Sequence, residues 1–256
     1  MEDTPHSEDE QSESSDNRTG SEATREPELH SRRAALYGYV ATALQFPDET
    51  TVADLTDDEV QDAVREAAAH VGFEDELDAL LDALDGADHE DLEAAYNRLF
   101  GLPEDGTYPV VPYEAHYTAE GDVSDTQRRI ATVVGLLEAF DLEPSDAFDE
   151  RQDHVAVELE LLQVLAAQRS IATERGDDDG AVTLTQATAT VLDEHLSPFV
   201  PSLAHDMGGT ADHDDTGEAV YVAAIDLAAA LVEFDAASHP DPVRPAAAPG
   251  EVTGDA

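Results

Sequence analysis

The sequence contains no cysteine, no tryptophan and no lysine. Without cysteine the chain can form neither a disulfide nor a thiolate metal site, so disulfide scaffolds and cysteine-ligated zinc proteins are excluded. All 12 basic residues are arginines, against 60 Asp and Glu, and the formal net charge is -48. A polyanion of this strength repels nucleic acids and anionic lipids, so nucleic-acid binding and binding to a membrane surface are excluded as well.

Long apolar segments are also absent. No apolar run reaches the roughly 18 residues that a membrane span requires, and the first thirty residues are acidic where an export signal would be basic. Residues 31–36, SRRAAL, have the form of a twin-arginine export motif. The polar and tyrosine-rich residues that follow, up to Pro47, favour a short amphipathic helix instead. We therefore expect a soluble cytoplasmic protein without stable membrane insertion.

The acidic residues are spread through segments that keep a regular apolar periodicity, and 41% of the 256 residues are hydrophobic. A chain of this length and composition can bury a sizeable core. Self-repulsion at -48 destabilises a compact state unless salt screens it, and the Debye length falls to about 3 Å at 1 M. The composition therefore predicts a halophilic cytoplasm, and the charge describes the solvent rather than the function.

Apolar spacing divides the chain into three parts. Residues 1–31 and 240–256 lack the apolar side chains needed to offset ordering entropy, so both are expected to be disordered tails. Between them, 32–239 shows helical periodicity, with no β-type alternation and no repeat. We predict an all-α, single-domain bundle of about eight or nine helices. The expected helices cover residues 32–46, 57–71, 76–84, 89–100, 125–140, 149–175 (the central one), 181–196, a short one from 198, and one after the loop 208–217.

One loop stands out between the predicted helices. Residues 101–123 are rich in proline and glycine, yet they hold large apolar groups that a solvated linker would not contain. These are Tyr108, Val110, Val111, Tyr113 and Tyr117. Long ordered loops inside compact domains are often functional. This loop is the first candidate site.

Catalytic motifs are missing: there is no glycine-rich phosphate loop, no G-x-S-x-G and no H-E-x-x-H. One loop gathers possible metal ligands, namely His205, Asp206, His213, Asp214 and Asp215, which could hold zinc or a similar ion. Acids are so frequent here that such neighbours arise by chance, as in Asp88-His89-Glu90. We expect no native metal site. A helical metal-dependent hydrolase using His205 and His213, and a non-catalytic oligomerisation scaffold, remain as alternatives.

A further trio lies at the start of the expected central helix. Asp153 and His154 precede Glu158, which is four residues after the histidine and on the same helix face. The three could form a general acid/base arrangement, or they could be a capping acid and a hydrogen-bonded histidine. No nucleophile or cofactor motif accompanies them, which favours the structural interpretation.

Four motifs in order resemble the TorD/DmsD/NarJ family of redox-enzyme maturation chaperones. They are Tyr96-Asn97-Arg98-Leu99-Phe100-Gly101, Pro112-Tyr113-Glu114-Ala115-His116-Tyr117, Asp153-His154-Val155-Ala156-Val157-Glu158-Leu159 and His195-Leu196-Ser197-Pro198-Phe199-Val200-Pro201. The resemblance implies a cytoplasmic all-α protein that is not an enzyme and has no cofactor. Its partner would be the apo catalytic subunit of a molybdopterin oxidoreductase of the DMSO, TMAO or nitrate reductase type. The chaperone would bind that subunit, through its twin-arginine leader, while the cofactor is inserted, and would delay export.

The resemblance also implies a set of client-binding residues. These are Tyr96, Phe100, Pro112, Tyr113, Glu114, Tyr117, Asp153, His154 and Glu158. Ala115 stands where family members often have serine, which removes a hydroxyl contact. Core packing is the alternative for Tyr96 and Phe100.

A leader peptide offers two arginines and an apolar stretch, so its receptor needs an apolar groove with acids at one end. The side chains expected to form that groove are Val110, Val111, Tyr113 and Tyr117. The acids expected near the arginines are Glu114, Asp153 and Glu158. We expect a monomer or homodimer.

Overall fold

The computed structural model describes residues 13–101, 108–119, 121, 123–145, 148 and 150–238, with side chains from Arg25 onward. These residues form eleven α-helices and one π-helical segment, which confirms the all-α prediction. The elements are α1 (Glu13–Ala43), α2 (Glu49–Thr56), α3 (Asp58–Val71), α4 (Glu74–Asp85), α5 (His89–Leu99), α6 (Glu114–Thr118), α7 (Val123–Ala139), α8 (Val155–Arg175), α9 (Asp178–Thr190), η1 (Val191–Leu196), α10 (Ser197–Thr210) and α11 (Thr216–Ser238).

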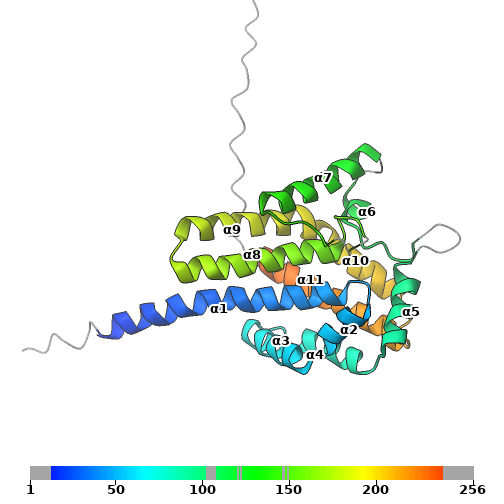
Figure 1. Cartoon of the computed structure of the whole chain (residues 1–256), viewed down its shortest axis with the longest axis horizontal. Coiled ribbons are helices and arrows are strands. Elements are labelled where there is room, and N and C mark those ends of the chain that lie inside the picture. The colour runs from blue at the N-terminus through cyan, green and yellow to red at the C-terminus, as the bar shows by residue number, and fades with distance from the viewer. Residues whose placement is uncertain are drawn as a thin grey trace, which may run out of the picture.

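The core lies around α8 and α11. Helix α8 runs beside both α1 and α9, while α11 packs against α1, α4, α5 and α10 (Figure 1). Leu159, Leu162 and Leu165 of α8 are fully buried, as are Leu227 and Leu231 of α11. Helix α8 is therefore the central helix that its wide apolar face predicts.

Short polar side chains fix where several helices begin. Asp57 precedes α3, and its carboxylate accepts hydrogen bonds from the backbone N–H groups of Glu59 and Val60. Thr56, the residue before it, ends α2, a short helix that is absent from the expected ranges. Asp88 forms a reciprocal capping box with Asp91 at the start of α5. Such caps satisfy N–H groups that the first turn of a helix leaves without partners.

The first helix is longer than its apolar spacing predicts. Helix α1 begins at Glu13, upstream of Arg32, so residues 13–31 of the expected disordered tail are helical. Packing explains part of the extension: Pro27 and His30 are buried, and the Ser170 hydroxyl donates a 2.8 Å hydrogen bond to the Pro27 carbonyl oxygen. The other tail residues, 1–12, and the expected tail after 239 lie outside the described residues.

The segment that resembles an export motif lies within α1 and is tied to the rest of the protein. Arg32 forms an ion pair with Glu66 of α3 at 3.0 Å. Arg33 pairs with the buried Asp235 of α11 at 3.1 Å, and the Tyr37 hydroxyl donates to the same carboxylate. These arginines serve the packing of α1 in this structure.

Helices α9 and α10 are joined by η1, a single π-helical segment. Single π-turns inserted in α-helices are uncommon and are frequent at functional sites. This one contains His195, whose side chain is buried. Pro198 then stands in the first turn of α10 and has no N–H to donate, and the carbonyl of Glu194, four residues earlier, accepts from Arg129 instead.

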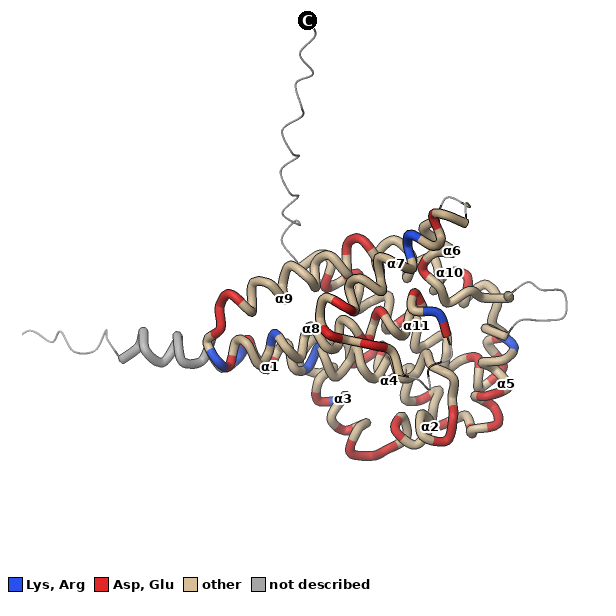
Figure 2. The backbone as a smooth tube through the Cα atoms, turned by 45° about the horizontal axis from the view of Figure 1, so that its top comes forward, with Lys and Arg blue, Asp and Glu red and all other residues tan. Residues whose placement is uncertain are grey.

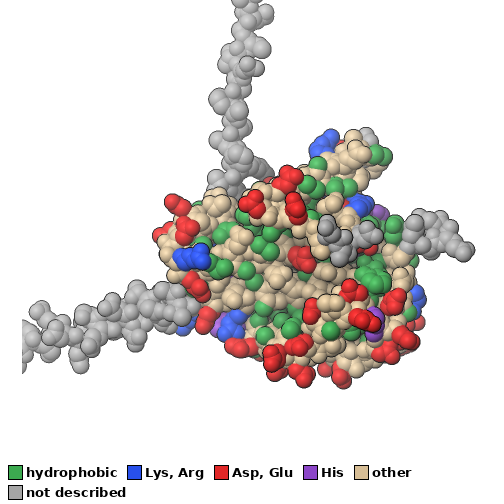
Figure 3. Space-filling view, viewed as in Figure 1, with side chains coloured by type: hydrophobic (Ala, Val, Ile, Leu, Met, Phe, Trp, Pro, Cys, Tyr) green, Lys and Arg blue, Asp and Glu red, His purple; other side chains and the backbone are tan. Residues whose placement is uncertain are grey.

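Acidic residues occur on most of the helices, and arginines are few (Figure 2). Acidic side chains surround smaller apolar patches on the face seen in Figure 3. Within the described residues, no helix is both long enough and apolar enough to cross a bilayer.

Candidate functional groove and the buried polar cluster behind it

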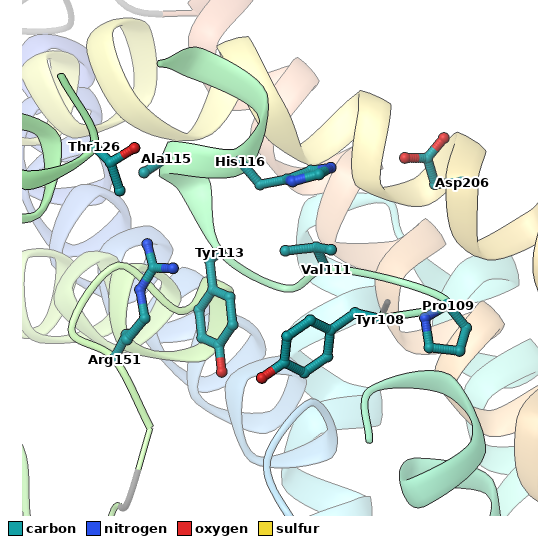
Figure 4. A pocket seen from close by; sticks show the side chains of 9 residues that line it. All are labelled: Tyr108, Pro109, Val111, Tyr113, Ala115, His116, Thr126, Arg151 and Asp206. Atoms are coloured by element: carbon teal, nitrogen blue, oxygen red, sulfur yellow. The ribbon is translucent and has the colours of Figure 1, made fainter. Parts of the chain in front are cut away.

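A groove of about 520 Å³ lies at the proline-rich loop that the sequence singled out. Its lining comes from that loop, α6, α7, α10 and the segment before α8 (Figure 4). The lining residues are Tyr108, Pro109, Val111, Tyr113, Ala115, His116, Thr126, Arg151 and Asp206. The groove thus combines aromatic and aliphatic walls with one arginine and one aspartate.

Two tyrosines form the aromatic wall. The rings of Tyr108 and Tyr113 meet edge to face, with centroids 6.4 Å apart. The guanidinium carbon of Arg151 lies 4.4 Å from the centre of the Tyr113 ring, and the Tyr113 hydroxyl donates to Glu150. Burial and the nearby Glu150 carboxylate raise the pKa of Tyr113, so its phenol stays protonated. These contacts hold the Tyr113 ring in one orientation.

The backbone next to this wall is joined to the start of α8. The Val155 N–H donates to the Pro112 carbonyl at 2.9 Å, and the Glu114 N–H donates to the Asp153 carbonyl at 2.8 Å. The fold therefore brings together two motifs that are far apart in the sequence. Pro112 is itself buried and serves this junction.

Asp153 is fully buried and already has its partners. Its carboxylate accepts from Arg151 at 2.9 and 2.6 Å and from the Ala115 N–H at 3.0 Å. A paired, hydrogen-bonded carboxylate of this kind stabilises the loop. It holds Arg151 beside Tyr113 and does not face the groove's open volume.

His154 caps α8 and is neutral. Its Nδ1 accepts a 3.1 Å hydrogen bond from the Ala156 N–H, so that nitrogen carries no proton. The ring packs edge to face against Tyr113 and Phe148. Complete burial lowers the pKa of His154 from 6.5 to about 3, because the charged imidazolium loses its hydration. The sequence leaves open a catalytic trio or a structural one, and the geometry of His154 is structural.

Glu114 and Glu158 lie behind the groove. Glu114 is fully buried and pairs with Arg129 of α7 at 2.8 Å, while His195 Nδ1 lies 3.2 Å from its carboxylate. Both oxygens of Glu158 are buried without a hydrogen-bond partner in the described structure. Burial, and then the charges of Glu114 and Asp153, raise the pKa of Glu158 well above its usual value.

The other predicted client-binding residues belong to the core. Tyr96 and Phe100 are 5% and 6% exposed, and their rings pack on each other and on Tyr221. Tyr117 is partly buried and packs against the buried Phe199, with ring centroids 6.0 Å apart. Of the predicted client-binding residues, Tyr113 is the one that lines the groove.

The loop of possible metal ligands does not form a site. His213 Nε2 is 3.1 Å from the Gly208 carbonyl oxygen, and His205 is exposed on α10. Arg98 engages Asp215 and Glu218, which ties the loop to α5. Among the described residues, the side chains close enough to share a metal ion are Glu114, Glu158 and His195, not those of this loop.

The partners of the buried acids are not evident from the sequence. Arg151 stands two residues before Asp153, a proximity that could have indicated the pair. Arg129 and Glu114 carry no local signal, because 60 acidic residues make every arginine a candidate partner. His195 did belong to a recognised motif, but nothing in the sequence connects it to Glu114.

Comparisons with known proteins agree with the motifs. Residues 59–205 match the family described as nitrate reductase delta subunit. The chain is also 29% identical over 149 residues to the chaperone protein TorD of Photobacterium profundum. That match covers 57% of this chain and 63% of the relative, so the chain spans less than two thirds of it. No solved structure matches the chain.

The matched segment contains Glu114, Glu158 and His195 and every lining residue of the groove except Asp206. It covers more than half of the chain and agrees with the four motifs. The family is one of chaperones that are not enzymes. The chain therefore belongs to the nitrate reductase delta subunit (NarJ/TorD) family of chaperones.

Proposed function

We propose that the protein is a chaperone for the apo catalytic subunit of a molybdopterin oxidoreductase of the DMSO, TMAO or nitrate reductase type. It binds the subunit through its twin-arginine leader, assists cofactor insertion and delays export. Family membership supports this proposal, and so does the groove. The single observation that carries it is an aromatic groove with an exposed acid at its rim.

The chemistry of a leader peptide suits this groove. Its apolar stretch would cover Tyr108, Val111 and Tyr113, which line one side (Figure 4). Asp206 lies on α10 across the groove and is exposed, so its carboxylate can receive an arginine. An amphipathic segment lying in an apolar groove is a common mode of peptide recognition.

The predicted acids take a different role in this proposal. Glu114 and Asp153 are buried and paired with the chain's own arginines, Arg129 and Arg151. They would position the Tyr113 wall rather than contact the client. Since long-range attraction is screened in molar salt, affinity must come from apolar burial and from close contacts such as those of Asp206.

The proposal is tested by isothermal titration of a leader peptide into the full chain in about 2 M KCl, where surface charge is screened. Losing a half-buried tyrosine or placing a charge in the groove removes about 1.5–3 kcal/mol of apolar contact. Tyr108→Ala and Val111→Asp should therefore weaken binding about 10- to 100-fold. Asp206→Asn should weaken it less.

Glu59→Gln, which removes an exposed acid on α3, is the matched control and should bind as the parent does. Equal effects from Glu59→Gln and Tyr108→Ala would contradict the groove. The same comparison with a peptide whose two arginines are replaced by glutamine tests the contact with Asp206.

We propose a salt-rich cytoplasm as the setting. The formal charge of -48 supports this, because screening must suppress self-repulsion. Unfolding monitored by circular dichroism should occur at lower temperature in about 0.1 M KCl than in about 2 M KCl, since the Debye length grows as salt is removed. A midpoint that does not change with salt would contradict this setting.

A further inference from the structure

Three ligand-type side chains converge behind the groove from three separate elements. Glu114 begins α6, Glu158 lies in the first turn of α8, and His195 lies in η1. One ligand atom from each lies within 4.8 Å of the others, and none of the three residues is more than 1% exposed. Burying ionisable side chains in a dry interior costs free energy unless ion pairs, hydrogen bonds or a bound ion compensate the lost hydration.

Protein groups compensate only part of the charge in this cluster. Arg129 pairs with Glu114, and Arg151 is engaged by Asp153. Among the described residues, no arginine bonds to Glu158 and neither of its oxygens has a hydrogen-bond partner. The outer nitrogen of His195, Nε2, is also buried without a partner among the described residues. The two residues thus present three unpartnered polar atoms in a buried space.

We propose that Glu114, Glu158 and His195 bind a divalent first-row transition ion, with Zn²⁺ as the representative. Carboxylate oxygens and imidazole nitrogens are both ligands of such ions, and three protein ligands leave a fourth position for water. The ion pair of Arg129 with Glu114 is an outer-shell contact that orients a ligating carboxylate. This site differs from the sequence expectation of no metal, and it is not the loop of His205 and His213.

The ion would have a structural role. It would join α6, α8 and η1, which otherwise meet at three buried side chains whose charge the protein compensates only in part. Tyr113 directly precedes Glu114, so fixing Glu114 also fixes the aromatic wall of the groove. The π-helical turn has a reason under this proposal, since it places His195 toward α6 and α8.

The site is tested by treating the full chain with EDTA, removing the chelator, and adding ZnCl₂ in about 2 M KCl, which screens the surface acids. At about 100 times the dissociation constant, one bound ion should raise the unfolding midpoint by roughly 5–10 °C. Elemental analysis after desalting should find about one ion per chain. Glu158→Gln and His195→Asn should each abolish the midpoint shift and the retained ion.

His213→Asn is the matched control, because it removes a histidine from the surface loop and should keep the full response. A parent chain without retained ion and without a midpoint shift would overturn the proposal. So would an equal shift in Glu158→Gln, because exposed carboxylates would then be binding the zinc.

Circular dichroism of the metal-free variants establishes that they fold, and Glu158→Gln is expected to do so because it removes a buried charge and keeps its shape. Leader affinity is measured separately with Zn²⁺ and with EDTA. Failure of the metal site would therefore leave the chaperone proposal standing.

Discussion

Replacing His154 by asparagine should flatten the dependence of stability on pH. In the folded protein, burial lowers the pKa of His154 to about 3, whereas the unfolded chain titrates near the ordinary value of 6.5. Below pH 6.5 the His154 imidazole therefore binds a proton in the unfolded state but stays neutral in the folded state. The stabilising contribution is complete above pH 6.5 and is lost as the pH falls through 6.5 toward 3.

The size of the effect follows from the two pKa values. At pH 8 the imidazole is neutral in both states and contributes nothing to the pH dependence. At pH 5 the protonated form of the His154 imidazole outnumbers the neutral form about 30 to 1 in the unfolded chain, whereas the folded protein keeps it neutral. This difference favours unfolding by about 2 kcal/mol. The parent should thus lose about 2 kcal/mol more than His154→Asn between pH 8 and pH 5.

Guanidinium chloride unfolding at both pH values measures this difference, since the denaturant also screens surface charge. Asparagine is a favourable N-cap, so the variant keeps a hydrogen bond to the Ala156 N–H and removes only the titration. The acids of the chain titrate alike in both proteins and cancel in the comparison. Equal losses of stability in parent and variant would refute a neutral, buried His154.

Four other substitutions test the packing, each by the same unfolding measurement. Leu162→Ala should cost about 2–5 kcal/mol, because it opens a cavity at a fully buried position of α8; a cost below about 1 kcal/mol would contradict the central place of α8. Gly217→Ala should cost about 1–3 kcal/mol, since the added methyl group would collide with the backbone of α5. Gly135→Ala should instead stabilise the protein by about 0.5–1 kcal/mol, because this position of α7 faces open space. Arg98→Ala should cost about 1–2 kcal/mol by leaving the buried Glu218 without its charged partner, discounted because the arginine is half exposed.

Helix positions were largely predictable because apolar spacing reports which face of a helix is buried. Leu159 and Leu162 share such a face, and the wide apolar face of α8 indicates that this helix is central. Helix α2 and the extension of α1 were not predictable in the same way. Pro27 and the surrounding acids disfavour a helix locally, and the extension depends partly on tertiary contacts such as that of Ser170 with Pro27.

The sequence indicates which loop contributes to the candidate site, but it does not indicate how the side chains are arranged there. The loop residues Val111 and Tyr113 do line the groove. The roles of the acids could not be predicted, because a sequence does not specify which arginine reaches a given carboxylate in the folded chain. Arg129 and Arg151 turn Glu114 and Asp153 inward, where they support the groove instead of facing it.

Client binding is tested by capturing the tagged full chain from its source cells in multimolar KCl and identifying the bound proteins by mass spectrometry. The parent is expected to retain a molybdopterin oxidoreductase catalytic subunit with its leader intact. Tyr108→Ala should lose most of that subunit, and Glu59→Gln should retain it. Capture of the chain alone from cells that make such an enzyme, or equal capture by all three proteins, would contradict client binding in the groove.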